Sequence, residues 1–518
     1  MKQFTSEQRK SIFYGRSGRS FKIEAGPGTG KTFTLINIAD AIAKENAKAR
    51  GLYLAYSSAI VAEAGRKMPK FVKSLTGHGL AYKELGYLFA NRINQRISGR
   101  VVSDYLKIGH CSYGNGKGDI DISPSAMGGL ALDTVNCYCQ TGSRVISADH
   151  MPWGRIPIDN IDVKKQVIEH VLFYANKLWM AMSDTHSTFP STHDVYLKLW
   201  ALDYPRINMD YILLDEGQDT NGVLLNIILR QLRHCQLIMV GNDNQSIFEW
   251  RGAINAMQQV ELGLEVSLTQ SFRFGEPIAH IANQVLKNFK GIDVHLKGFD
   301  GIDSRIGYCE KPDAIISRTN AVLLKELMSQ LDMNRRIGVA GGTGQIKSLL
   351  YGINDLKNNR QTNINELSLF KSYRELKEYS ETPSGGDLKS LITQVDKYGI
   401  QNLLNALNKV KAFDKKSRPE DFDLVLLTGH KSKGLEFKEV KLTNDFYHPG
   451  SKKYTPMDAN LLFVSVTRAQ NILDISECDA AQKALYNQVE KVDVESETEA
   501  SAPSPRKLRS GVEGNDGF

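Results

Sequence analysis

Short apolar runs bounded by turn residues recur along the chain, and stretches with helical periodicity follow them. Apolar runs of this kind are typical of buried parallel strands. They occupy residues 21–25, 51–55, 211–214, 237–240, 313–316 and 424–427. Helical stretches such as 32–45 and 221–232 alternate with them. The pattern predicts an α/β fold with two parallel sheets.

Two long stretches interrupt this alternation. Residues 82–205 contain a Gly-rich patch and helical segments, and residues 338–419 are rich in Lys, Asn, Leu and Glu with helical periodicity through 387–413. Both stretches are predicted to be mostly helical insertions. Residues 490–518 combine Glu, Ser, Pro, Gly and Arg with few large apolar groups, so they are predicted to form a disordered tail.

Composition limits the class of protein. The 518 residues are 41% hydrophobic and 24% charged, which excludes a collagen-like, wholly disordered or membrane-embedded chain. The net charge of +7 permits a polyanionic partner but also fits solvated surface. The six cysteines show no C-x-x-C spacing, and no signal peptide or long apolar run occurs. We expect a cytoplasmic protein with no membrane partner.

A phosphate-binding loop follows the first predicted strand. Its residues are Ala25, Gly26, Pro27, Gly28, Thr29, Gly30, Lys31 and Thr32. The glycines let backbone N–H groups surround phosphate, Lys31 reaches the outer phosphates, and the Thr32 hydroxyl can bind Mg²⁺. The strict pattern has glycine where this chain has Ala25, but the strand-loop-helix context predicts the same loop.

An acidic pair ends the strand at 211–214. In a P-loop protein, Asp215 at the end of a strand can hold the metal, and Glu216 can orient and deprotonate the attacking water. This pairing indicates hydrolysis rather than phosphoryl transfer to a substrate. For Asp219, which follows closely, capping of the next helix is a reasonable alternative.

The segment 241–253 follows the strand at 237–240 and combines polar and aromatic residues. Gln245 can sense the γ-phosphate, while Phe248 and Trp250 can stack on unpaired bases. The segment would then contact both ligands. Taken alone, the two aromatic residues are more typical of a buried core.

Seven motifs in this order resemble superfamily 1 DNA helicases of the UvrD/Rep type. The motifs are Phe4 to Gln8, AGPGTGKT, LLDEGQD, VGNDNQSIFEWRGA, LTQSFR, TGHKSKGLEF and FVSVTRA. Within that group, the segments at 192–200 and 268–275 resemble those of the F-box DNA helicases, and because the first motif starts at Phe4 we expect no F-box ahead of it. We therefore expect a motor without the adaptor region, in a bacterial, archaeal or viral setting.

The resemblance implies two RecA-like domains with ATP and Mg²⁺ between them. The first would comprise residues 1–81 and 206–275 with a 1B-like insertion at 82–205, and the second residues 276–337 and 420–489 with a 2B-like insertion at 338–419. It also implies that Gln8 reads adenine with Phe272 stacked nearby, and that Glu436 bonds the ribose. Gln245 would couple the γ-phosphate to DNA, and Arg273 and Arg468 would reach the γ-phosphate across the cleft.

For DNA, the resemblance points to Tyr56, His78, Phe248, Trp250 and His430. The residues after Tyr56 depart from the family pattern, and His78 is equally explained as a loop histidine. The predicted function is an ATP-dependent 3′–5′ helicase or translocase acting on single-stranded DNA and junctions in replication, repair or recombination. We expect a monomer or weak oligomer, with replication or recombination proteins as partners. The alternatives are a translocase that strips proteins from DNA and a nucleotide-gated scaffold.

Overall fold

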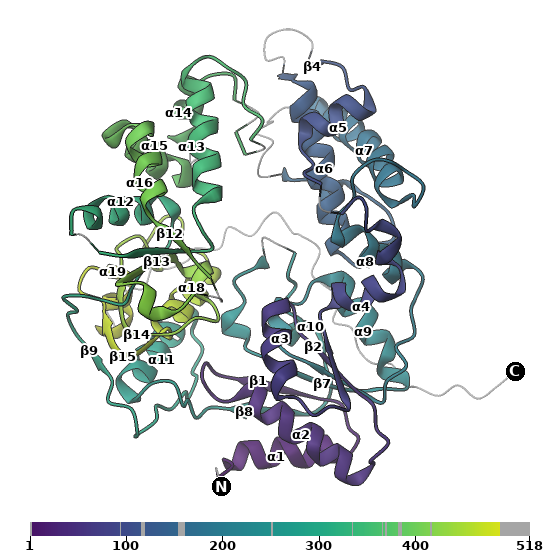
Figure 1. The fold of residues 1–518 in the computed structure, drawn as a ribbon, viewed down its shortest axis with the longest axis vertical. Helices are drawn as coiled ribbons and strands as arrows, with labels where there is room; N and C mark the ends of the chain where they lie inside the picture. The colour runs from purple at the N-terminus through teal and green to yellow at the C-terminus, as the bar shows by residue number, and fades with distance from the viewer. Residues whose placement is uncertain are drawn as a thin grey trace, which may run out of the picture.

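Two parallel sheets, each with a helical arm, make up the described part of the chain (Figure 1). The computed structural model describes residues 3–93, 95–114, 120–153, 161–249, 252–333, 335–364, 366–367, 370–381, 386–414 and 417–486. The predicted disordered tail at 490–518 lies outside these residues. None of the described helices is both long and apolar enough to span a bilayer.

The first sheet has six strands in the order β3-β2-β6-β7-β1-β8, all paired in parallel. The strands are β1 (Phe21–Ala25), β2 (Gly51–Leu54), β3 (Val72–Leu75), β6 (Tyr211–Leu214), β7 (Gln236–Gly241) and β8 (Glu265–Leu268). Successive side chains point to opposite faces, so Tyr211 and Leu213 enter one core while Ile212 and Leu214 enter the other. This two-sided burial explains why the strands consist of continuous apolar runs.

Helices cover both faces of the first sheet. The helices are α1 (Ser6–Arg16), α2 (Lys31–Glu45), α3 (Ser58–Lys67), α4 (Gly77–Glu84), α8 (His193–Leu202), α9 (Gly222–Leu229) and α10 (Ala256–Gln259). Helix α2 contributes Leu35 and Ile38 to one core, and α9 contributes Ile227 and Ile228 to the opposite core. Because all strands are parallel, their carboxyl ends meet at one edge, where the loops after β1, β6 and β7 lie together.

The second sheet has seven strands in the order β12-β11-β13-β10-β14-β15-β9. The strands are β9 (Arg305–Ile306), β10 (Ala314–Ser317), β11 (Ile337–Ala340), β12 (Lys411–Phe413), β13 (Leu424–Thr428), β14 (Phe437–Leu442) and β15 (Ala469–Asp474). Its helices are α11 (Glu276–Lys290), α12 (Asn320–Gln330), α17 (Gly429–Ser432), α18 (Pro456–Val466) and α19 (Asp479–Tyr486). The predicted α/β class with two RecA-like parallel sheets is confirmed.

The arm between β3 and β6 is mostly helical, as predicted. It contains α5 (Gly99–Leu106), α6 (Pro124–Gln140), α7 (Ile161–Ser183) and a two-stranded antiparallel ribbon of β4 (Cys111–Tyr113) and β5 (Ile120–Ile122). The three helices share a core of their own. Buried Arg92 donates to the carbonyls of Met182 and Asp184 at the end of α7, which ties the arm to its base.

The other arm differs from the sequence expectation at its ends. Its helices are α13 (Gly344–Lys357), α14 (Tyr373–Ser380), α15 (Gly386–Tyr398) and α16 (Ile400–Lys409). The segment predicted as a helical insertion at 338–419 also includes most of β11 and all of β12, two strands of the second sheet itself. Phe413, assigned to helical periodicity, lies in β12. Three-residue strands are too short for a period of two to be recognised.

Candidate functional site

The loop between β1 and α2 has the backbone that the phosphate-binding motif requires. Gly28 and Gly30 have φ of +76° and +81°. A Cβ on Gly28 would lie 2.6 Å from both the Arg273 Cβ and the Ser271 Oγ, so only glycine fits there. Ala25, the departure from the strict pattern, ends β1, and its carbonyl accepts a 3.1 Å bond from the Asn242 side chain. The alanine therefore leaves the loop intact.

Gln8, predicted to read adenine, lies against this loop. Helix α1 begins with a capping box in which the Gln8 side chain accepts from the Thr5 N–H while the Thr5 hydroxyl accepts from the Gln8 N–H. The Gln8 amide also donates to the Thr29 carbonyl at 3.5 Å, and the residue is buried. Its recognition of adenine remains a prediction.

Lys31 and Glu216 form an ion pair at the carboxyl edge of the first sheet. Their Nζ and Oε1 atoms lie 2.7 Å apart, with side chains 15% and 17% exposed. The second Glu216 oxygen accepts from Gln218 at 2.5 Å. Burial opposes ionisation of Glu216, but Lys31 and Lys433 outweigh it and bring its pKa down to about 2. The backbone of Glu216 lies in the left-handed region, with φ of 54°, which is strained for a residue with a side chain.

Asp215 is held more deeply than Glu216. The Tyr53 hydroxyl donates to its Oδ2 at 2.6 Å, and the Glu216 N–H donates to its Oδ1 at 2.9 Å. Burial raises the pKa of Asp215 to about 6, with the charge of Glu216 adding to the rise and Lys31 opposing it. The Asp215 carboxylate and the hydroxyl of Thr32, which follows Lys31 in α2, are oxygen groups that suit Mg²⁺, because this ion takes hard oxygen ligands and relies on substrate phosphates for others.

Lys433 crosses from the second sheet to this cluster, and the sequence analysis did not identify it. Its ammonium donates to Asp219 Oδ1 at 2.7 Å and to the Gln245 carbonyl at 2.6 Å. Burial raises the pKa of Asp219 to about 6, and Lys433 partly offsets that rise. Asp219, interpreted as a possible helix cap, is instead one half of an ion pair. The pair joins the first body, as we name the first sheet with its helices, to the second body, which is the second sheet with its helices.

A cavity of about 430 Å³ lies beside the phosphate loop. Its lining includes Gly28, Phe272, Arg273 and Glu436. The Arg273 Nε donates to Glu436 Oε2 at 2.6 Å, and its Nη1 donates to the Thr467 carbonyl at 3.2 Å. The Phe272 ring is exposed, and its centroid lies 5.6 Å from the centroid of the Phe299 ring. The structure thus brings together four residues that the motifs assigned to nucleotide.

Arg468 is buried behind Arg273. Only 2% of the residue is exposed, and its guanidinium donates to the carbonyls of Val464 and Leu435 and to the Thr467 hydroxyl. Burial and the neighbouring Arg273 charge lower the pKa of Arg468 well below its ordinary value. A buried cation with a like charge beside it is an environment that an anion would stabilise.

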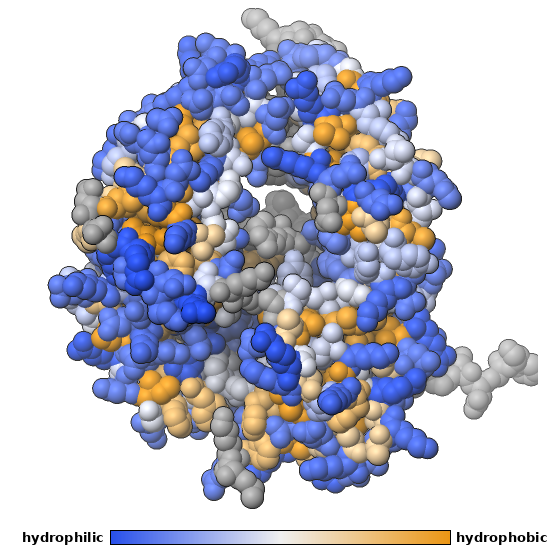
Figure 2. Space-filling view, in the orientation of Figure 1, coloured by the Kyte–Doolittle hydropathy of each residue, from blue (hydrophilic) through white to orange (hydrophobic). Residues whose placement is uncertain are grey.

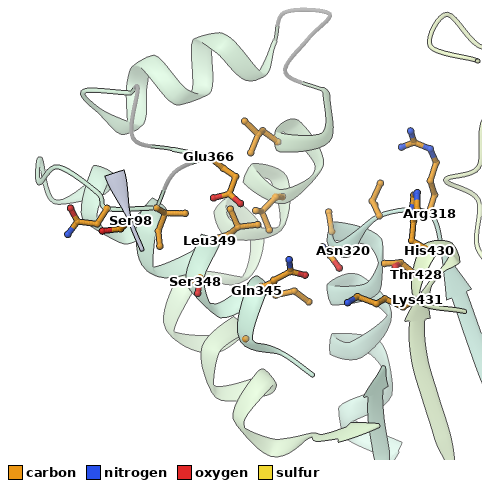
Figure 3. Close-up of a pocket in the computed structure, with 18 of the residues that line it drawn as sticks. Ser98, Arg318, Asn320, Gln345, Ser348, Leu349, Glu366, Thr428, His430 and Lys431 are labelled. Atoms are coloured by element: carbon orange, nitrogen blue, oxygen red, sulfur yellow. The ribbon is translucent and has the colours of Figure 1, made fainter. Parts of the chain in front are cut away.

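A larger cavity of about 840 Å³ is lined by residues of both arms and by residues at the ends of second-sheet strands (Figure 3). Figure 2 shows the surface hollowed between these arms. The groove, as we name this cavity, is lined by Phe248, His430 and Lys431, by the N-terminal residues of α12 and α13, and by Arg96 on the opposite arm. Helix N-termini carry positive potential, and α13 begins at Gly344 with no hydrogen bond from the side chain of its N-cap residue Thr343.

The remaining predicted DNA residues are distributed differently. Phe248 and His430 lie close together, with ring centroids 6.3 Å apart. Tyr56 is exposed at the end of β2 and lies outside the described groove lining. His78 is also outside it and lies 2.7 Å from Asp194, in an aromatic cluster with Tyr196. Trp250 lies outside the described residues.

Comparison with known families matches both halves of this arrangement. The UvrD/REP helicase N-terminal domain matches residues 169–261, and the UvrD-like helicase C-terminal domain matches residues 423–473. Segments of this chain are therefore similar to both domains of UvrD-like helicases. The resemblance identified from the seven motifs is confirmed.

The proteins to which this chain is similar are helicases by name. It is 28% identical to F-box DNA helicase protein 1 of Schizosaccharomyces pombe, over 92% of this chain and 58% of the relative. It is also 28% identical to F-box DNA helicase 1 of Gallus gallus, over 92% of this chain and 49% of the relative. A probable DNA helicase II homolog of Mycoplasma genitalium is 23% identical, over 56% and 44% of the two chains.

The chain therefore spans about half the length of the curated relatives it matches. The two relatives that match 92% of this chain come from a fungus and a bird, so the expected bacterial, archaeal or viral setting gains no support. UvrD-like helicases use ATP with a divalent metal, which agrees with the nucleotide and Mg²⁺ predictions at this level.

Proposed function

We propose that the chain is an ATP-driven motor that moves along single-stranded DNA and unwinds junctions with 3′–5′ polarity. The observation that carries the proposal is the path of the segment 242–248. At one end, the Gln245 carbonyl is bonded to Lys433, which also pairs with Asp219 beside the phosphate loop. At the other end, Phe248 lines the groove. A change of conformation at the nucleotide site can therefore be transmitted to the groove through the few residues between Gln245 and Phe248.

Nucleotide binding begins with a competition for Lys31. The β- and γ-phosphates are the natural partners of a P-loop lysine, so ATP would draw the ammonium away from Glu216. Losing that neighbour raises the pKa of Glu216 from its low value, which makes its carboxylate a better acceptor for a proton from water. Lys31 would thus make hydrolysis conditional on bound phosphate.

Thr32 and Asp215 would hold Mg²⁺, which neutralises phosphate charge when bound. Tyr53 keeps the Asp215 carboxylate in a fixed orientation through its 2.6 Å bond. Arg273 can exchange its exposed partner Glu436 for the γ-phosphate, while Arg468 supplies charge from within the second body. Gln8 and Phe272 would hold adenine, and Glu436, once released, would bond the ribose.

The groove is the proposed path of single-stranded DNA. Arg96, Lys431 and the amino ends of α12 and α13 would bind phosphates, while Phe248 and His430 would contact bases. Trp250 and Tyr56 are proposed to add contacts. Cycles of closure and reopening between the bodies would then advance the strand, in replication, repair or recombination.

ATP hydrolysis by the purified chain, measured with and without single-stranded DNA, tests the proposal. Lys31→Ala serves to subtract contaminating activity. We expect strong stimulation that the variant abolishes, followed by displacement of a strand from a junction with a 3′ single-stranded tail. DNA-independent turnover would refute the motor and favour the nucleotide-gated scaffold. Stimulated turnover without strand displacement would favour the translocase that strips proteins from DNA.

A further inference from the structure

Three consecutive residues of the first body are held by side chains of the second. Lys433, after α17, donates to the Gln245 carbonyl, and Asn460 of α18 donates to the Ser246 carbonyl at 2.9 Å. Lys290, the last residue of α11, donates to the Asn244 side chain at 2.8 Å. Ile247, which follows Ser246 in the chain, is fully buried in the core of the second sheet. The segment 244–247 is therefore packed into the second body although it continues a strand of the first.

Lys290 connects two of these contacts. Its ammonium lies 2.8 Å from the Oδ1 of Asn244 and also 2.8 Å from the Oδ1 of Asn460. Burial lowers the pKa of Lys290, and the charges of Asp243, Glu249 and Glu24 oppose that shift. The bridge therefore joins the loop after β7 to α11 and α18 through one partly buried cation.

Asp243 and Glu24 extend this network towards the phosphate loop. The Asp243 N–H donates to Glu24 Oε1 at 3.0 Å, and Glu24 is the residue before Ala25, where β1 ends. Burial and the nearby Asp243 raise the pKa of Glu24 to about 8. A continuous series of short contacts thus runs from the strand that carries the phosphate loop to α18, the helix that precedes Arg468.

We propose that Lys290 is a positioning residue that transmits closure of the two bodies to the 244–248 segment and so makes ATP hydrolysis respond to DNA. The inference rests on the proposed function. Asn244 and Asn460 lie on different bodies, so the ammonium holds its two bonds only while the bodies keep their relative position. Strand entry at Phe248 and movement of α18 would each change the geometry of this bridge. Neither ligand needs to touch Lys290 itself.

Lys290→Met tests this role because methionine retains much of the apolar stem and removes the ammonium. Loss of one charge-assisted bond corresponds to a change of about tenfold or more in an equilibrium or rate. We expect the DNA-stimulated kcat to fall about tenfold, while basal kcat, measured without DNA, stays within about twofold. Lys290→Arg should recover part of the stimulation. Lys287→Met, an exposed lysine on the same helix, is the matched control and should behave as wild type.

Asn244→Ala removes the other end of the same bond and tests the role if Lys290→Met fails to fold. The double variant should lose no more stimulation than Lys290→Met alone, since that substitution already removes the bond to Asn244. A Lys290→Met protein with the wild-type ratio of stimulated to basal kcat would overturn the inference. So would a proportional loss of both rates with a lowered melting temperature, which is the result of a purely structural role. Wild-type protein without DNA stimulation would instead overturn the proposed function.

Discussion

Glu216→Gln separates nucleotide binding from hydrolysis. Glutamate offers a carboxylate oxygen to Lys31 and another to Gln218, at 2.7 and 2.5 Å. Glutamine has nearly the same shape but only one acceptor oxygen, so it can keep one of these donors and not both. It also cannot take a proton from water. The substitution therefore removes the proposed base while leaving the phosphate loop in place.

The magnitude follows from the two roles. Loss of a general base lowers kcat by a factor of roughly 10² to 10⁴. Loss of one hydrogen bond at a largely buried site costs about 1–3 kcal/mol of stability, which lowers the melting temperature without unfolding the protein. Because the variant also removes the charge that competes with phosphate for Lys31, we expect ATP to bind at least as tightly as in the wild type.

Equilibrium binding of a fluorescent ATP analogue and steady-state hydrolysis with saturating single-stranded DNA measure the two effects. Glu63→Gln is a suitable control, since Glu63 is an exposed glutamate paired with Lys67 on α3. Turnover of Glu216→Gln within about threefold of wild type would contradict a base whose loss costs at least a hundredfold. Loss of ATP binding with normal folding would show that Glu216 organises the loop instead.

Two further predictions concern the same cluster. Tyr53→Phe removes a hydrogen bond that favours the ionised form of Asp215, so the pKa of Asp215 should rise above its present value of about 6. The acid limb of the pH profile of kcat should then move to higher pH. An unchanged acid limb would exclude the contact between Tyr53 and Asp215 as the cause of that limb. Lys433→Met leaves the Asp219 carboxylate buried without its cation and should lower stability by about 3–5 kcal/mol. Adding Asp219→Asn should recover much of that loss in chemical denaturation, and strictly additive losses would refute the pairing.

The sequence predicted the sheets well because their strands are buried on both faces. The run Tyr211–Leu214 is apolar at every position, which marks a parallel strand without any tertiary information. The phosphate loop was equally predictable, since its glycines, lysine and threonine are local to one turn. The short strands β11 and β12 were absorbed into the predicted insertion, because they contact the sheet through partners distant in sequence.

The contacts between the two bodies were beyond prediction for the same reason. Lys433 and Lys290 look like ordinary surface lysines in the sequence. They lie 188 and 46 residues along the chain from their acceptors Gln245 and Asn244, and only folding brings them into contact. The burial of Arg468 was also unforeseen, although its motif was recognised. A motif assigns a residue to a ligand, but it does not specify which carbonyl groups hold that residue before the ligand arrives.

The two arginines differ in what must move for them to act. Arg468 is fixed by three bonds within the second body, so it can approach the phosphate loop only when that body moves as a unit. Arg273 is tied chiefly to Glu436, whose side chain is 49% exposed, so its ion pair is weak enough for a phosphate to replace. Burial and the Arg273 charge both lower the pKa of Arg468, so an anion that binds Arg273 also stabilises the charged form of Arg468. In the proposed cycle, capture of phosphate by Arg273 would therefore favour closure, and closure would bring Arg468 into place.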